Sequence, residues 1–63
     1  MKYVYKGREI RNSDARKVAI NGEVVSEIVN KGAKMQTVSY RGRLFHVTRV
    51  PSLPFVVVSR HAV

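Results

Sequence analysis

The chain has 63 residues, of which 12 are Lys or Arg and 4 are Asp or Glu, so its formal net charge is +8. A chain this short makes a single domain and buries only about 60% of the surface that it exposes when unfolded. Because it has no cysteine, neither a disulfide nor a thiolate metal site is possible. With two histidines and four carboxylates scattered among twelve basic residues, the sequence predicts no zinc or calcium site and no cofactor.

The first glycine lies in the stretch VYKGREI, between Tyr3 and Ile10. A glycine between apolar strand-forming residues is typical of a hairpin turn, so the sequence predicts a turn at Lys6-Gly7 with Tyr5 opposite Arg8. Lysine adopts a positive φ less readily than asparagine, and a longer loop with a glycine bulge is the alternative.

The middle of the chain, residues 13–31, allows two readings. Asn21-Gly22 lies between β-branched residues, which predicts a tight hairpin turn with positive φ at the glycine. The four-residue spacing of Val24 and Ile28, with Gly32 as a stop, instead favours short helices over 13–20 and 23–31. Two helices followed by a basic hairpin would form a winged helix-turn-helix, and one short helix among strands is an intermediate case.

The stretch SYRGRLF predicts the third turn, at Arg41-Gly42. A turn there places Tyr40 opposite Arg43, Val38 opposite Phe45, and Gln36 opposite Val47 on one largely apolar face. The opposite face is mixed, with Thr37 facing His46. One apolar and one mixed face are typical of a half-buried hairpin, so we expect Val38 and Phe45 in the core.

The C-terminal part begins with PSLP, which predicts a loop between two strands. FVVVS then indicates a strand buried on both faces, with Arg60 and His61 exposed after it. Among the aromatic residues we expect Tyr3, Phe45 and Phe55 in the core. Tyr5 and Tyr40 lie next to basic turns, where a ring can stack on a nucleobase or a guanidinium group.

The predicted fold is therefore a small β-rich single domain over residues 1–63, all-β or α+β. It is built from hairpins as a curled antiparallel sheet or small barrel, with one or two short helices within 13–31 as an option.

The stretch VYKGREI followed by a basic sheet resembles the opening hairpin of small archaeal chromatin proteins. The stretch NGEVVSEIVNKGAKM before a hairpin resembles the recognition helix and sheet of phage Cro-type repressors. The two resemblances imply different folds, and we claim neither family.

The charge excess indicates a polyanionic partner, and we expect DNA or RNA. A one-signed charge that merely keeps a small protein soluble is the simpler alternative. The longest apolar run, FVVV, is too short to span a membrane. No apolar core of a signal peptide follows Met1, so we expect a cytoplasmic location, at the nucleoid if the partner is DNA.

No catalytic motif accompanies His46, so we do not expect an enzyme. We expect a protein that binds the phosphate backbone through basic turns, where glycine also lets backbone N–H groups approach a phosphate. The alternative is a small phage- or plasmid-type accessory or inhibitor protein that binds an acidic host protein, and a homodimer is a further option. The candidate binding residues at the turns are Lys6, Arg8, Tyr40, Arg41 and Arg43. If the sheet curls, Lys31, Lys34 and Arg49 join them.

Overall fold

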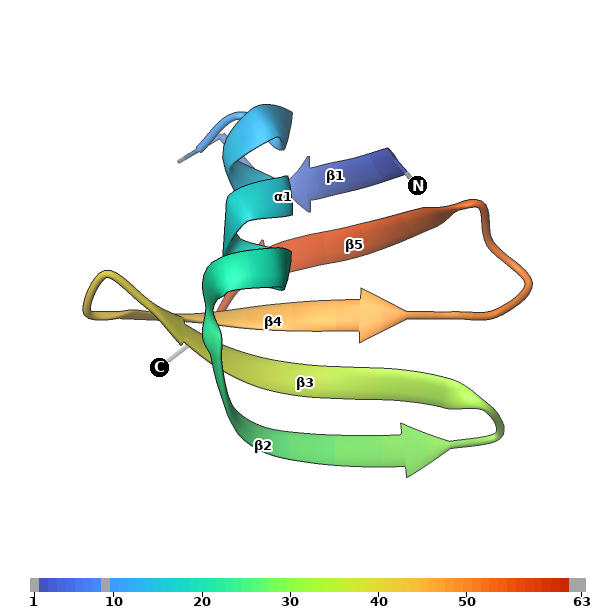
Figure 1. Cartoon of the computed structure of the whole chain (residues 1–63). Helices are drawn as coiled ribbons and strands as arrows, with labels where there is room; N and C mark the ends of the chain where they lie inside the picture. Colours follow the sequence, from blue (N-terminus) through green and yellow to red (C-terminus); the bar gives the residue numbers. More distant parts are fainter. Residues whose placement is uncertain (1, 9, 62–63) are drawn as a thin grey trace.

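The computed structural model describes residues 2–8 and 10–61, in which one helix packs on a five-stranded sheet (Figure 1). The protein is thus a small β-rich single domain, as predicted, with one short helix. The elements are, in chain order, β1 (Lys2–Lys6), α1 (Asn12–Asn21), β2 (Glu23–Asn30), β3 (Ala33–Tyr40), β4 (Arg43–Arg49) and β5 (Phe55–Arg60).

The strands are arranged in the order β1-β5-β4-β3-β2. β1 pairs in parallel with β5, from opposite ends of the chain, while the other neighbours are antiparallel. The sheet is therefore mixed and open, and the predicted barrel or purely antiparallel sheet is wrong. The hairpin at Lys6-Gly7 is also wrong, and with it the resemblance to chromatin proteins, because the chain after β1 leads into α1 instead of turning back.

The helix α1 corrects the prediction of a hairpin at Asn21-Gly22. Gly22 has φ −70° and its N–H donates to the carbonyl of Val18 at 3.0 Å, so this pair ends a helix. The helical reading of 13–20 is confirmed, since Ala15 and Val18 share one buried face. The helical reading of 23–31 is wrong, because its β-branched residues form β2. The helix-turn-helix and the Cro-type resemblance therefore fail.

Two tight turns have positive φ at both central residues, as type I′ hairpin turns require. Arg41 and Gly42 have φ 51° and 77°, and the predicted register of this hairpin, including Val38 opposite Phe45, is confirmed. Lys31 and Gly32 have φ 51° and 81° and join β2 to β3. Gly32, predicted as a helix stop, is therefore a turn residue.

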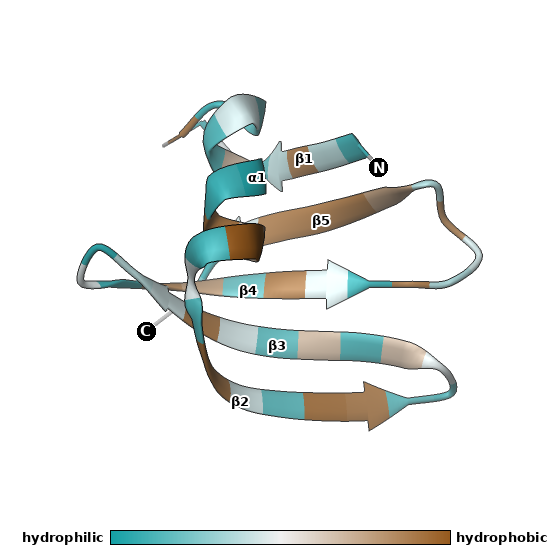
Figure 2. Ribbon diagram, in the orientation of Figure 1, coloured by the Kyte–Doolittle hydropathy of each residue, from teal (hydrophilic) through white to brown (hydrophobic). Residues whose placement is uncertain are grey.

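The core lies between α1 and one face of the sheet. Figure 2 shows apolar residues along most of β5 and at some positions of α1 and β4. Tyr5 is among the buried residues and Tyr3 is half-buried against them, so the open position considered for Tyr5 is wrong. The buried set is Tyr5, Ala15, Val18, Val38, Phe45, Val47, Val56 and Val58.

Burial alternates along β5 because the helix covers one face only. Val56 and Val58 are buried, whereas Phe55 and Val57 on the other face are half-buried. The prediction that FVVVS is buried on both faces is therefore wrong, and so is the placement of Phe55 in the core. Among the described elements, none covers this second face of the sheet.

Candidate nucleic-acid interface

The turn between β3 and β4 places two arginines at one end of the sheet. Arg41 is the first turn residue, and Arg43 is the first residue of β4, directly opposite Tyr40. The guanidinium carbon of Arg41 lies 5.5 Å from the centre of the Tyr40 ring, within cation–π range. Tyr40 is half-buried and Arg41 is exposed. The ring therefore contacts one side of the guanidinium group and leaves its charge in solvent.

Two neighbouring hollows, each of about 370 Å³, lie beside this turn and share Arg43. The first also contains Arg60 and His61 from the end of β5, over a floor that includes Phe45. The second contains Lys17 from α1 together with Arg41. Basic side chains from three separate elements therefore meet around Arg43.

Lys6 and Arg8 lie at the same end of the sheet. β1 runs parallel to β5, with Lys6 opposite Ser59, so both strands finish where β4 begins. Arg8 follows in the exposed loop that leads to α1. In Figure 1 the ends of β1 and β5 and the β3–β4 turn all lie on the left. We call this set of residues the basic end: Lys6, Arg8, Lys17, Arg41, Arg43 and Arg60.

The other three predicted binding residues lie at the opposite end of the sheet. Lys31 is in the β2–β3 turn, and Lys34 and Arg49 line a third hollow beside Gly32. The length of β4 separates Arg49 from Arg43. The sheet does not curl enough to bring the two groups together.

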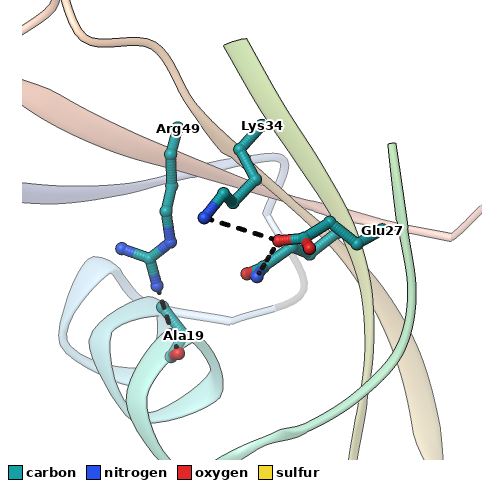
Figure 3. Close-up of polar contacts among 5 residues, drawn as sticks. Ala19, Glu27, Lys34 and Arg49 are labelled. Carbon is teal, nitrogen blue, oxygen red and sulfur yellow. Dashed lines mark hydrogen bonds and ion pairs between the residues drawn. The ribbon is translucent and has the colours of Figure 1, made fainter. Parts of the chain in front are cut away.

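Two basic side chains at this far end make intramolecular contacts (Figure 3). The Nη2 atom of Arg49 donates to the carbonyl of Ala19 at 3.3 Å, in the last turn of α1, where a cation is favourable. The Nζ atom of Lys34 lies 3.6 Å from Oε1 of Glu27. These contacts give Arg49 and Lys34 structural partners. The charged side chains that line the two hollows around Arg43 are mostly cationic, with Asp14 as the acidic member among the described residues.

Among the residues that the structure describes, two carboxylates lie near the basic end, those of Asp14 and Glu23. Of the described residues that line the first two hollows, only Asp14 is acidic. Glu23 begins β2 at this end, opposite Ser39, while Glu27 is paired with Lys34. The hollows therefore present a cationic lining with an apolar floor, which suits an anionic group.

The two histidines are close together. Their rings stack with centroids 4.7 Å apart and planes inclined by 22°. His61 is half-buried, so the expectation that it lies exposed is wrong, whereas Arg60 is exposed as predicted. His46 lies opposite Thr37, as the register predicted.

Over residues 2–8 and 10–61, no cluster of three or more His, Cys, Asp or Glu side chains could hold a metal ion. In the same part of the chain, no helix has the length and apolar character needed to cross a membrane.

The sequence reasoning missed Lys17 and Arg60 as members of the basic end. Lys17 lies three residues after Asp14 on the helix, and Arg60 was assigned only to an exposed tail. The signal for Lys17 was present in the helical reading of 13–20. The position of Arg60 depends on the β4–β5 pairing, which no local sequence pattern predicts.

Comparison with known proteins adds no family to this description, since no protein-family model, curated protein or solved structure matches the chain. The fold and its charges define the class: a small basic domain with one helix on an open mixed sheet.

Proposed function

We propose that the protein binds nucleic acid, DNA or RNA, through the phosphate backbone, and that it does so as a non-enzymatic binding protein. One observation carries this proposal: Lys17, Arg41, Arg43 and Arg60 converge from α1, β4, β5 and the β3–β4 turn around two adjoining hollows. On a chain with net charge +8, such a convergence favours a ligand with regularly spaced negative charges.

The arginines supply the recognition. A guanidinium group can donate two parallel hydrogen bonds to the oxygens of one phosphate, which makes Arg43, at the boundary of both hollows, the central contact. Arg41 at the turn tip and Arg60 at the end of β5 can reach phosphates on either side. Backbone contacts fix the orientation of the nucleic acid and carry no base sequence.

Affinity then comes mainly from the release of counterions from the nucleic acid. The logarithm of the binding constant falls linearly with the logarithm of salt concentration, with a slope of about −0.9 per phosphate contact on duplex DNA and about −0.7 on single strands. We therefore expect similar affinities for unrelated sequences at equal salt. A cytoplasmic location, at the nucleoid for a DNA partner, is part of the same proposal.

The test is a binding titration over about 50–200 mM salt, a range in which phosphate contacts change affinity strongly. Labelled duplex DNA, single-stranded DNA and RNA of unrelated sequences serve as probes. The double variant Arg41→Gln/Arg43→Gln is compared with Lys31→Gln/Lys34→Gln, which removes the same charge at the far end of the sheet. We expect the first variant to lose affinity on every probe and to lower the slope by about one for each phosphate that it no longer neutralises.

Two results would contradict the proposal. If the wild type shows no salt-dependent binding to any probe, nucleic acid is not the partner, and a nuclease-controlled pull-down then tests the acidic protein partner. If both double variants lose affinity equally, binding follows net charge alone and the basic end is not the site.

A further inference from the structure

The strand β2 is an open edge of the sheet, and all eight of its residues are exposed. Four of them are apolar and β-branched: Val24, Val25, Ile28 and Val29 are each exposed by 50% or more. Edge strands are normally protected by charged side chains, above all lysine, by proline, by a bulge or by a covering segment. The bulge of β2 lies between Val24 and Ser26, so the regular run from Ser26 to Asn30 has one charged side chain, that of Glu27, and no lysine, proline or bulge, and none of the described elements covers it.

The opposite edge of the sheet, β1, is covered from within the chain. The backbone N–H of Tyr5 donates to Oδ1 of Asn12 at 2.9 Å, and α1 packs against β1. The two edges therefore differ, and only β2 offers a long apolar ladder to another strand.

The β2–β3 turn determines which backbone groups of β2 are available. Asn30 and Ala33 flank the two-residue turn and form a hydrogen-bonded pair, so Ile28, two residues earlier, also directs its N–H and C=O toward β3. Glu27 and Val29 alternate with these residues and direct their N–H and C=O groups away from β3. The free edge therefore presents donors and acceptors at Glu27 and Val29.

We propose that a second copy of this chain pairs with β2 in antiparallel fashion, about a two-fold axis at Ile28. In this register Glu27 lies opposite Val29 of the partner subunit, and the reverse, so the free donors and acceptors of both copies are used. Ile28 faces Ile28 of the partner subunit as a non-hydrogen-bonded pair, in which side chains lie closest. Ser26 lies opposite Asn30 of the partner subunit, which matches polar with polar. Such an isologous contact closes at two copies.

Charge selects a second copy as the occupant. The carboxylate of Glu27 is already matched within its own chain by Nζ of Lys34 at 3.6 Å and by Nε2 of Gln36 at 3.0 Å. The edge is therefore locally neutral and apolar, and a neutral apolar strand complements it; β2 is itself such a strand. Lys6 and Arg60 lie on β1 and β5, toward the edge of the sheet opposite β2. Pairing about the two-fold axis therefore keeps these positive charges of the two copies apart. This inference does not depend on the proposed function.

Disulfide trapping tests the register. The chain has no cysteine, so Ile28→Cys and Val29→Cys each introduce a single thiol at a similarly exposed position of β2. A disulfide needs Cα atoms about 4.4–6.8 Å apart, and a non-hydrogen-bonded pair provides about 4.5 Å. Diagonal neighbours lie about 7–8 Å apart, so we expect mostly covalent dimer for Ile28→Cys and mostly monomer for Val29→Cys. Equal trapping of both, or faster trapping of Val29→Cys, would overturn the two-fold at Ile28.

Mass measurement over a concentration series tests the pairing itself, on protein freed of nucleic acid by nuclease. We expect the wild type to reach twice the monomer mass. Ile28→Lys, which places two lysines face to face at the axis, should raise the dissociation constant by about tenfold or more and keep the native circular dichroism. Leu44→Lys, at an exposed position away from the β2 edge, should leave the dissociation constant unchanged. A wild type that remains a monomer throughout, or an unaffected Ile28→Lys dimer, would overturn the proposal.

Discussion

Val38 and Phe45 lie directly opposite each other across the β3–β4 hairpin, and both side chains are buried, with 1% and 5% of their surface exposed. This pair connects the core to the candidate site. The strand positions that bury Val38 and Phe45 also fix the turn, whose central residues lie three residues from them, so they determine where Arg41 and Arg43 project.

Phe45→Ala should cost about 3–5 kcal/mol of unfolding free energy, because it removes a large side chain from the core and leaves a cavity. A small domain has only about 5–15 kcal/mol in total, so we expect a large fall in the denaturation midpoint. Leu44→Ala is the matched control, since Leu44 is 42% exposed and precedes the buried Phe45 on β4. It should change the free energy by about 0.5 kcal/mol or less. A Phe45→Ala midpoint equal to that of Leu44→Ala would contradict the assigned core.

Gly22 and Gly42 should respond differently to substitution, because the structure requires glycine at each for a different reason. A Cβ at Gly22 would collide with Cγ1 of Val38 and the carbonyl of Val18, although its φ suits any residue. A Cβ at Gly42 meets nothing within 4 Å, but φ is +77°. We expect Gly22→Ala to cost about 1–3 kcal/mol through overpacking.

Urea denaturation of these variants measures the cost, and asparagine provides the contrast because it tolerates positive φ. Gly42→Asn should cost less than Gly42→Val, for which we expect about 1–2 kcal/mol. Gly22→Asn should be at least as harmful as Gly22→Ala. If Asn were the milder substitution at Gly22, the steric explanation would be wrong.

The sequence predicted the β3–β4 hairpin to the residue because every determinant of it is local. Arg41-Gly42 supplies the turn, and alternation around it supplies the register and the buried face. The same reasoning failed at Lys6-Gly7, where the partner of β1 is β5, from the other end of the chain. A parallel pairing at that separation depends on the whole fold, and no short pattern encodes it.

The turn at Asn21-Gly22 failed for another reason. Asn-Gly favours a hairpin when strands flank it, but Ala15 and Val18 form a helical face that α1 buries against the sheet. Burial of that face outweighed the local preference of the pair. For the candidate site, the sequence predicted the basic residues at the β3–β4 turn. Their grouping with Lys17 and Arg60 could be seen only once the helix and the β4–β5 register were known.

Asn12→Ala should destabilise the protein by about 1–2 kcal/mol, because it removes the side-chain oxygen that accepts the backbone N–H of Tyr5 at 2.9 Å. This hydrogen bond joins β1 to the start of α1, so its removal affects two elements at once. Asn12→Asp keeps an acceptor in the same place and should be less destabilising. Thermal melts of the two variants check this, and equal melting temperatures for Asn12→Ala and the wild type would contradict it.

Arg60→Gln and Arg49→Gln should separate binding from stability, although each removes one positive charge. Arg60 is exposed and lines the hollow beside Arg43 and His61, so Arg60→Gln should leave the unfolding free energy nearly unchanged. It should weaken binding on unrelated nucleic-acid sequences and lower the salt slope by about one. Arg49 instead donates to the carbonyl of Ala19, so Arg49→Gln should cost about 0.5–1.5 kcal/mol of stability and change the slope little. Salt-series titrations and urea denaturation of both variants measure the two effects. An Arg60→Gln variant that keeps its affinity and slope would show that this hollow receives no phosphate, and the interface would then be confined to the side of Arg43 that faces Lys17 and Arg41.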